Sequence, residues 1–482
     1  MNKPVTPSIE EAKARMHMVL EVQKRAQVKQ GPPDARRRKD RLARCVTLLQ
    51  NHKDELVAAM RADFGERSRD MSMLTDVAGA MGPAKQAIAQ LDGWMKTERR
   101  KVTPAALGLL GAKAEVRYQP KGVIGVMTPW NFPVQLSFDA IAGAFAAGNR
   151  VMLKPSEFTP ETSALMARLI DLYFDEDELA VILGGPEVGA AFAALPFDHI
   201  IFTGATSVAK HVMRAAAENL VPLTLELGGK SPVLVGRSAD LAKTAARVMA
   251  GKTMNAGQIC LAPDYVLAPR EKLDGFVAEA ETAVRKMFPT LKDNGDYTAI
   301  INQRHFDRIK GLIEDARSKG ARIVEINPAS EDFSQQEHRK IPPTLIIEPT
   351  DDMAVMQEEI FGPVLPIKSY TTFGETLDYV NAHPRPLAAY YFGDDSSESE
   401  QVLERTHSGG VTINDVIFHF SMDDLPFGGV GPSGMGSYHG HDGFLEFSHK
   451  KAVFRQTPSE VTAMFRPPYG EAFRKQVAAR LK

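Results

Sequence analysis

Cysteine is scarce in this chain: Cys45 and Cys260 are the only two among 482 residues. So few thiols exclude a disulfide framework, and we expect a reducing compartment, the cytoplasm, in which a thiol matters only through its chemistry. Long apolar runs are lacking too, and the stretch from Met1 to Met18 mixes acids and bases without the apolar core of a signal peptide. The sequence therefore predicts a cytoplasmic protein with no membrane partner.

An excess of charge of one sign is also lacking, because the formal net charge is −2. Such a chain creates no field that collects nucleic acid, and the short basic run at residues 36–41 has Asp34 and Asp40 beside it. We interpret this run as a solvated helix face. Neither a nucleic-acid partner nor a metal ion is expected.

What the chain does have is length and a globular composition, with 44% hydrophobic and 24% charged residues. A chain of 482 residues exceeds what one hydrophobic core organises, so two or more domains with a cleft between them are expected. The N-terminal hundred residues read as helices, in which apolar residues including Cys45 recur at helical spacing after the candidate cap Asp34. Cys45 is interpreted as a structural thiol, and no residue of this part is expected to do chemistry.

From Val116 onward, short apolar runs alternate with helical patterns, as in a parallel, doubly wound α/β sheet. Strands are expected at residues 122–127, 151–153, 181–183, 199–202 and 223–227, with helices such as 160–174 between them. Polar or glycine-containing motifs follow these strands, at residues 129–131, 154–157, 184–185, 203–204 and 226–229. Because ligands bind beyond the carboxyl ends of the strands in such sheets, these motifs predict a binding crevice there.

A second α/β region is expected from residue 230 to residue 427, with helices at 273–287 and 305–318 and strands at 265–267 and 345–347. No linker or internal repeat separates the two regions, so the boundary is placed by motif near Gly228.

Cys260 ends the stretch Asn-Ala-Gly-Gln-Ile-Cys, which is polar and is expected to expose the thiol. Oxidation of an aldehyde by hydride transfer needs a tetrahedral carbon that bears an oxyanion, and a thiolate makes one by adding to the carbonyl. The thiohemiacetal becomes a thioester when it loses hydride, and a nicotinamide is the simplest acceptor. These steps make Cys260 the candidate nucleophile.

Glu226 is the candidate base, because a carboxylate beside a thioester can deprotonate the hydrolytic water. It lies in Leu-Glu-Leu-Gly-Gly-Lys, where the two glycines are expected to leave the carboxylate uncovered. The rival use of the thiol is a papain-like pair with a histidine. The nearest histidines along the chain, His211 and His305, are more than forty residues from Cys260, although a spatial neighbour stays possible.

Asn131 lies in Pro-Trp-Asn-Phe-Pro, a loop that two prolines stiffen. Its amide N–H₂ can partner the backbone N–H of Cys260 in an oxyanion hole, and the loss of one such donor costs about 3 kcal/mol of transition-state stabilisation.

Four further residues are expected to hold a dinucleotide. Lys154 and Glu157 follow a strand and can each bond a ribose hydroxyl, and the Glu157 carboxylate disfavours a 2′-phosphate by about 4 kcal/mol at about 4 Å and an effective dielectric of about 20. NAD is therefore expected to be preferred to NADP. Glu359 and Phe361, an acid and an aromatic ring in Glu-Glu-Ile-Phe-Gly-Pro, suit the nicotinamide ribose and ring.

Taken together, these motifs resemble the aldehyde dehydrogenase superfamily over nearly the whole chain. Lys-Pro-Ser-Glu, Phe-Thr-Gly, Leu-Glu-Leu-Gly-Gly-Lys-Ser-Pro, Gly-Gln-Ile-Cys and the two motifs around Asn131 and Glu359 occur in the family's order. Asn-Asp-Val at 414–416, Pro-Phe-Gly-Gly-Val-Gly at 426–431 and Ser-Gly-Met-Gly at 433–436 are similar to the class 3 branch, and more narrowly to bacterial coniferyl-aldehyde dehydrogenases.

The resemblance implies the same roles for Cys260, Glu226 and Asn131, and cofactor contacts from the residues Trp130, Lys154, Glu157, Gly204, Glu359 and Phe361. It implies an NAD-binding domain of residues 1–110 and 121–227, a catalytic domain of residues 228–430, and oligomerisation elements at 111–120 and 431–482. Class 3 relatives are usually dimeric, so a homodimer is expected. The implied substrate is a small aldehyde, aromatic like coniferyl aldehyde or else a medium- or long-chain aliphatic one.

Two departures qualify this resemblance. Residues 204–209 read Gly-Ala-Thr-Ser-Val-Ala, which lacks a side-chain donor and a glycine that the family commonly places near the pyrophosphate, and no Gly-x-Gly-x-x-Gly fingerprint is present. Other readings stay open: an acylating enzyme that passes the thioester to coenzyme A, or a non-catalytic protein that keeps the fold. For the aromatic substrate, a pocket of Phe132, Ile417, Phe418 and Phe420 is expected.

Overall fold

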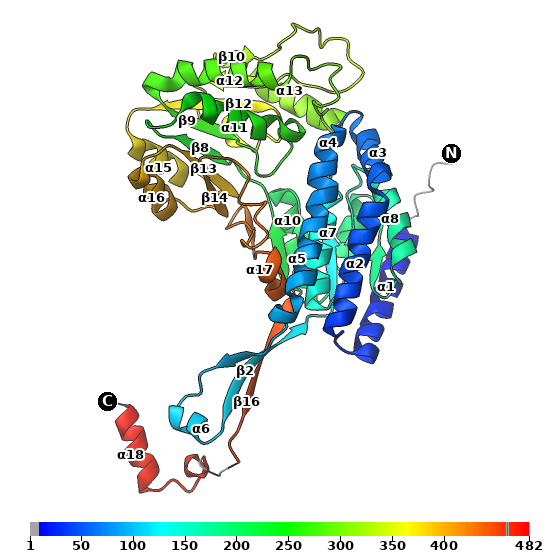
Figure 1. Cartoon of the computed structure of the whole chain (residues 1–482), viewed down its shortest axis with the longest axis vertical. Coiled ribbons are helices and arrows are strands. Elements are labelled where there is room, and N and C mark those ends of the chain that lie inside the picture. The colour runs from blue at the N-terminus through cyan, green and yellow to red at the C-terminus, as the bar shows by residue number, and fades with distance from the viewer. Residues whose placement is uncertain (1–8, 459, 461, 482) are drawn as a thin grey trace.

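Three β-sheets organise the chain in the computed structural model, which describes residues 9–458, 460 and 462–481. Two of them are mostly parallel sheets with helices on both faces, so the predicted α/β fold with two doubly wound sheets is confirmed. In Figure 1 the two sheets lie in separate lobes, and the third sheet extends away from both as a narrow arm.

The first sheet has six strands in the order β15-β7-β6-β3-β4-β5. Their bounds are β3 Val123–Met127, β4 Arg150–Lys154, β5 Leu179–Val181, β6 His199–Thr203, β7 Leu223–Glu226 and β15 Gly434–Met435. All neighbours are parallel except β15, which returns from the C-terminal part of the chain and pairs antiparallel with β7. The crossover helices are α7 Gln135–Ala147, α8 Pro160–Tyr173, α9 Pro186–Ala193 and α10 Thr206–Ala217.

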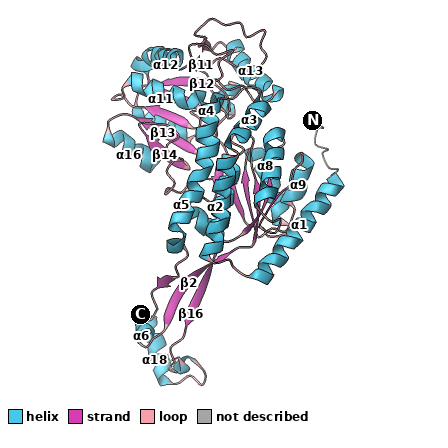
Figure 2. Cartoon of the chain, turned by 45° about the vertical axis from the view of Figure 1, so that its right-hand side comes forward, coloured by secondary structure: helices cyan, strands magenta, loops and turns pink. Residues whose placement is uncertain are grey.

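Alternation along the strands assigns each face of this sheet to its own helices. Ile124 and Val126 pack in one core with helices α2, α5, α7 and α8, whereas Val123 and Met127 pack in another with α1, α9 and α10. The N-terminal helices are α1 Ile9–Gln30, α2 Ala35–Asn51, α3 Lys53–Phe64, α4 Arg69–Ser72, the π-helical η1 Met73–Ala78 and α5 Gly79–Trp94. Figure 2 shows α2 and α5 on one side of the strands and α1 and α9 on the other.

The second sheet has seven strands in the order β10-β11-β12-β9-β8-β13-β14, antiparallel only between β10 and β11. Their bounds are β8 Pro232–Val235, β9 Tyr265–Pro269, β10 Arg322–Glu325, β11 Thr344–Ile347, β12 Val364–Tyr370, β13 Ala388–Phe392 and β14 Gly410–Ile413. One face packs on α11 Leu241–Thr253 and α12 Leu273–Met287. The other packs on α13 Gln303–Ser318, α14 Ala354–Gln357, α15 Phe373–Asn381 and α16 Ser396–Arg405. Short 3-10 turns lie at η2 Met254–Gly257, η3 Arg270–Lys272 and η4 Ala463–Phe465.

The arm is a three-stranded antiparallel sheet in the order β1-β2-β16. Its strands are β1 Glu98–Arg100, β2 Lys113–Pro120 and β16 Ser448–Arg455, and every residue of β2 has a partner in β16. The helices α6 Ala105–Leu109 and α18 Glu471–Arg480 lie near its far end, and α17 Gly440–Glu446 lies at its base (Figure 1). Strands distant in sequence thus meet here, and they include residues from both segments, 111–120 and 431–482, that were expected to serve oligomerisation.

Helices and strands follow the sequence patterns closely. Asp34 caps α2 by accepting from the backbone N–H of Arg37 at 2.8 Å, and Cys45 is buried on the apolar face of that helix. The strand predicted at 181–183 lies two residues earlier, as β5.

The domain boundaries stay predictions. Along the described part of the chain, no helix combines the length and apolar character needed to span a bilayer.

Candidate active site

Loops from both sheets meet around Cys260, and two glycines bring them into close contact. A Cβ on Gly257 would lie 2.3 Å from the carbonyl oxygen of Gly362, which joins the loop before Cys260 to the loop after Glu359. A Cβ on Gly228 would lie 2.2 Å from the carboxylate oxygens of Glu359, which joins the same loop to the end of β7. Because any side chain would collide at these two positions, only glycine permits this convergence.

The loop before Cys260 has an unusual backbone that its own side chains hold. Asn255, Ala256 and Gly257 all have positive φ, at 48°, 52° and 72°. The buried Gln258 side chain donates to the carbonyl of Asn255 at 2.9 Å and to that of Ala299 at 3.1 Å, and its oxygen accepts from Ile301 N–H at 3.0 Å. The loop thus places Cys260 between α11 and β9 in a fixed position.

The Cys260 thiol is half-buried, which corrects the expectation of an exposed thiol. Burial first, and then the carboxylates of Glu359 and Glu226, raise the pKa of Cys260 to about 12, while the backbone N–H groups of Cys260 and Leu261 act in the opposite direction. The two carboxylates therefore lie near enough to the sulfur to act on its charge. A thiolate here requires a base that takes its proton or a positive charge beside it.

Glu226 ends β7 and is buried, with 3% of its surface exposed. The expectation of an uncovered carboxylate is wrong, because strands β6 and β15 flank it at Thr203 and Gly434. Neither carboxylate oxygen has a hydrogen-bond partner among the described residues, and burial, followed by the charge of Glu446, raises the pKa of Glu226 well above its usual range. A carboxyl in this state is typical of a general acid or base.

Asn131 is buried at the start of the loop that leads into α7, and its side chain points to the Cys260 loop. Its Nδ2 donates to the carbonyl oxygen of Gln258 at 3.1 Å, and the same oxygen accepts from Asn255 Nδ2 at 3.2 Å. One amide hydrogen of Asn131 is thus used to position the group, and an amide N–H₂ has a second hydrogen for another acceptor.

A buried ion pair that the sequence did not indicate holds this loop in place. Arg67 donates to the carbonyl oxygen of Asn131 at 2.8 Å and pairs with Asp76 at 2.7 Å. Asp76 is fully buried and also accepts from the backbone N–H groups of Val134 and Gln135. The N-terminal helices, which were expected to lie apart from the chemistry, therefore position the Asn131 loop.

The residues expected to hold a dinucleotide ribose lie at the end of β4 and just after it. The Lys154 ammonium is buried and forms an ion pair of 3.0 Å with Glu157, whose side chain is 32% exposed. Gly204 directly follows β6, and its N–H donates to the carbonyl oxygen of Glu226 at 3.0 Å. A Cβ on Gly204 would come within 2.7 Å of the Phe202 ring, so the backbone stays bare before α10.

Glu359 and Phe361, which are also expected to contact the cofactor, come from the second sheet region, whereas Lys154, Glu157 and Gly204 come from the first. Burial, and then the charge of Asp264, raise the pKa of Glu359 to about 8, although the N–H of Gly229 and the charge of Lys230 act against this. The Phe361 ring meets the Trp130 ring edge-on at 5.4 Å. These contacts put Trp130 and Phe361 side by side at the junction of the two sheets.

A cleft of ≈ 400 Å³ lies at this junction and is lined by Thr206, Gly228, Glu359, Arg385 and Pro432, among others. It contains the N-terminus of α10, and a helix N-terminus favours phosphate. Glu359 Oε1 is buried beside bare Gly228 and has no partner among the described residues. The unpaired carboxylate oxygen of Glu359, the bare backbone at Gly228 and the N-terminus of α10 together fit a dinucleotide.

The expected aromatic pocket is only partly formed by the residues named for it. Phe132 is buried, with the Arg67 guanidinium 5.2 Å from its ring centre, and Phe418 is 56% exposed. Phe420 is half-buried and meets Phe427 edge-on at 4.8 Å, and Ile417 is half-buried beside it in sequence. Phe427, which the sequence did not single out for this role, is the ring that Phe420 contacts.

A thiol near two carboxyls, at the strand ends of an α/β fold with a dinucleotide-sized cleft, is the arrangement expected of a dinucleotide-dependent oxidoreductase. The sequence profile of the aldehyde dehydrogenase family matches residues 7–453, and the chain belongs to that family. It is an enzyme that oxidises the aldehyde group.

Similar proteins refine this assignment. The chain is 63% identical to a probable coniferyl aldehyde dehydrogenase of Caulobacter vibrioides, over 100% of both chains. It is 56% identical to the coniferyl aldehyde dehydrogenase of a Pseudomonas strain, over 94% of this chain and 93% of that one. The substrate-bound structure of Staphylococcus aureus AldH has a TM-score of 0.90 at 35% identity, and covers 97% of this chain and 99% of its own. A Mycobacterium tuberculosis aldehyde dehydrogenase with NAD⁺ has a TM-score of 0.83 at 29% identity, over 93% and 91%.

Proposed function

We propose that this enzyme oxidises an aromatic aldehyde such as coniferyl aldehyde to its carboxylate with NAD⁺, and hydrolyses a thioester on Cys260. One observation carries the proposal: close contacts at Gly257 and Gly228 join the loop before Cys260 to the loop that contains Glu359, and that loop to the end of β7, which carries Glu226. The two curated relatives named for coniferyl aldehyde support the substrate class. The balanced reaction consumes aldehyde, NAD⁺ and water and yields carboxylate, NADH and two protons.

Cys260 acts first, as the nucleophile. Its sulfur adds to the carbonyl carbon, its proton passes to a neighbouring carboxylate or to solvent, and the carbonyl oxygen becomes an oxyanion. The second amide hydrogen of Asn131 and the backbone N–H of Cys260 donate to that oxygen. The N–H groups of Cys260 and Leu261, which act on the thiol charge in the structure, support this placement.

Glu359, Lys154 and Glu157 would hold the ribose groups of a bound cofactor, Phe361 and Trp130 would contact the nicotinamide, and Gly204 would approach the phosphates. The oxidised nicotinamide, when bound, accepts the hydride of the thiohemiacetal. The carboxylate of Glu157 favours NAD over NADP, because it repels a 2′-phosphate. NADP remains the alternative cofactor.

Glu226 then takes a proton from the water that attacks the thioester carbon, and the Cys260 sulfur leaves. The buried, unpaired carboxyl supports this role, because it spends no hydrogen bond on the protein. The alternative, in which coenzyme A accepts the acyl group, needs no such base.

An assay of NADH formation tests the proposal. We expect coniferyl aldehyde to be oxidised without coenzyme A, with the free acid as product, and Cys260→Ala to be inactive. Strict dependence on coenzyme A would overturn hydrolysis, and undiminished activity of Cys260→Ala would overturn the covalent step. A comparison of kcat/KM for coniferyl aldehyde, benzaldehyde and octanal separates the aromatic substrate from the aliphatic alternative.

We further propose a cytoplasmic homodimer, with the NAD-binding, catalytic and oligomerisation parts divided as the sequence predicts. The projecting arm supports this assembly, because β16 lies at an edge of its sheet and presents Phe454, which is 53% exposed. Sedimentation of the full chain is expected to give a dimer, and removal of residues 448–482 is expected to give a monomer. A monomeric full chain contradicts this.

A further inference from the structure

Asp139 and His439 form a buried polar pair that the proposed mechanism does not use. Asp139 lies on α7 and is 3% exposed, and His439 precedes α17 and is 7% exposed. His439 Nε2 lies 3.9 Å from Asp139 Oδ2, too far for a hydrogen bond. Neither carboxyl oxygen of Asp139 nor His439 Nε2 has a hydrogen-bond partner within the described part of the chain.

Buried polar atoms without partners are rare, because their desolvation is not repaid. The backbone adds to the cost, since His439 has a φ of 101°, a conformation that side chains seldom adopt. Both features are typical of a site whose missing partner is a ligand.

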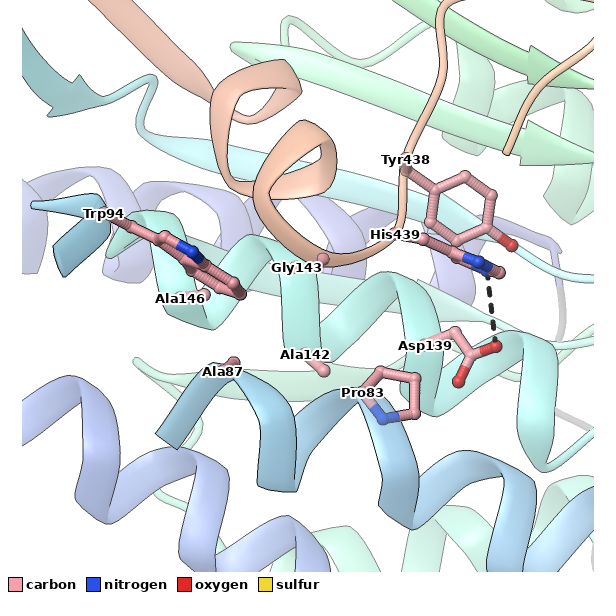
Figure 3. Close-up of a pocket in the computed structure, with 10 residues that line it drawn as sticks. Pro83, Ala87, Trp94, Asp139, Ala142, Gly143, Ala146, Tyr438 and His439 are labelled. Atoms are coloured by element: carbon pink, nitrogen blue, oxygen red, sulfur yellow. Dashed lines mark ion pairs between the residues drawn. The ribbon is translucent and has the colours of Figure 1, made fainter. Parts of the chain in front are cut away.

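The two side chains line a small pocket that has room for one oxygen atom. Figure 3 shows them facing each other in a small pocket with Tyr438 and Trp94. The pocket has a volume of ≈ 10 Å³, which is about one water-sized group. An oxygen that lies beside the pair can be about 2.8 Å from both Asp139 Oδ2 and His439 Nε2.

The protonation states suit a hydroxyl better than an ion. Burial, and then the charges of Asp423 and Asp76, raise the pKa of Asp139 well above its usual range. Burial, and then His419, lower the pKa of His439 to about 4. The pair thus offers a neutral imidazole and a carboxyl whose neutral form burial favours, and each of these groups has a donor and an acceptor.

The pair lies close to the candidate active site. Gly434, five residues before His439, is the register partner of Glu226 in the β15 and β7 ladder. Tyr438 forms an isolated β-bridge with Phe427. Burial first, and then the charges of Asp139, Glu226 and Cys260, raise the pKa of its hydroxyl. Tyr438 therefore lies near both the polar pair and the reacting groups.

Aromatic rings border the same pair. The His439 ring stacks on Phe427 at 5.2 Å and meets Phe420 edge-on at 5.0 Å. Stacked and edge-on contacts of this kind would also stabilise the aromatic ring of a bound ligand.

We propose that Asp139 and His439 bind the ring hydroxyl of a hydroxylated aromatic aldehyde, while Phe420 and Phe427 contact its ring. This inference rests on the proposed function and names the feature of the substrate that the enzyme recognises. The hydroxyl donates to one member of the pair and accepts from the other, so an aldehyde without it leaves both unpaired. A site built in this way discriminates strongly against the substrate that lacks the hydroxyl.

The test compares kcat/KM for coniferyl aldehyde with that for cinnamaldehyde, which lacks the ring hydroxyl. We expect the ratio to favour coniferyl aldehyde in the wild type and to fall by about 10-fold to 100-fold in Asp139→Leu. Asp139→Asn is the matched control, because its amide still donates and accepts, and its ratio is expected to stay within about 3-fold of the wild type. His439→Phe, which keeps a ring on Phe427, gives a second reading if the leucine variant does not fold.

The outcomes separate this inference from the proposed function. An equal ratio in the wild type and in the folded apolar variant means that the pair holds only ordered water, and overturns the inference while the dehydrogenase stands. A wild-type enzyme that oxidises neither aldehyde overturns the proposed function itself. A ratio that falls in Asp139→Leu or His439→Phe but not in Asp139→Asn supports the hydroxyl site.

Discussion

The Asn131→Ala variant separates the catalytic role of Asn131 from its structural role. The structure limits the structural cost, because the Gln258 carbonyl that accepts from Asn131 also accepts from Asn255 Nδ2 at 3.2 Å and stays satisfied. The backbone carbonyl of Asn131 keeps its bond to Arg67 in the variant. We therefore expect the free energy of unfolding to fall by only about 1 kcal/mol, the net value of one hydrogen bond.

The catalytic cost is larger, because the proposed role gives Asn131 one of two oxyanion donors. Its loss is expected to reduce kcat by about 100-fold to 1,000-fold, on the order of 3 kcal/mol. Steady-state NADH formation measures kcat, and chemical denaturation measures stability. Asn131→Asp keeps the shape but loses the donor, so it should lose at least as much activity as the alanine variant. A fall in kcat of less than about 5-fold, or a loss of stability large enough to explain it, would refute the reasoning.

The remaining predictions concern the base, the cofactor and the loop before the thiol. Glu226 must be ionised to act and its pKa is raised, so the rate of acyl-enzyme hydrolysis should rise about tenfold per pH unit below that pKa. Glu226→Gln should abolish this pH dependence. Single-turnover release of the acid after the NADH burst measures the hydrolysis rate. Glu157→Gln should raise the ratio of kcat/KM for NADP over NAD by about 5-fold to 10-fold, because Glu157 is exposed and its repulsion of a 2′-phosphate falls from about 4 kcal/mol at an effective dielectric of about 20 to about 1 kcal/mol in water. An unchanged ratio argues against the ribose contact. Gly257→Ala should lower the free energy of unfolding by on the order of 3 kcal/mol, because its Cβ meets the Gly362 carbonyl at a φ of 72°; a thermal shift of zero contradicts the close approach.

Much of the fold follows from local pattern. The helix predicted at residues 273–287 coincides with α12, and the five parallel strands of the first sheet lie within two residues of the expected ranges, whereas β15 was not predicted. Apolar periodicity and turn residues decide these elements locally, and a single chain displays both. The glycines at 228 and 257 also stand in motifs that could be recognised, because only glycine permits the contacts they make.

The burial of the reacting groups could not be predicted in the same way. Glu226 was expected to be uncovered because glycines follow it, but β15 returns from more than two hundred residues later and covers it. The same holds for Arg67 and Asp76, whose positions in helical sequence carry no sign that they hold the Asn131 loop. Such contacts depend on tertiary pairing, to which local sequence gives no access.

Trapping the acyl enzyme tests the central claim most directly. Glu226→Gln, mixed with NAD⁺ and coniferyl aldehyde, quenched and digested, should carry the acyl mass on the peptide that contains Cys260, with about one NADH released per subunit. The Cys260→Ala variant should carry no adduct and release no NADH. An adduct on another residue, or NADH released without any adduct on Cys260, would contradict the covalent mechanism.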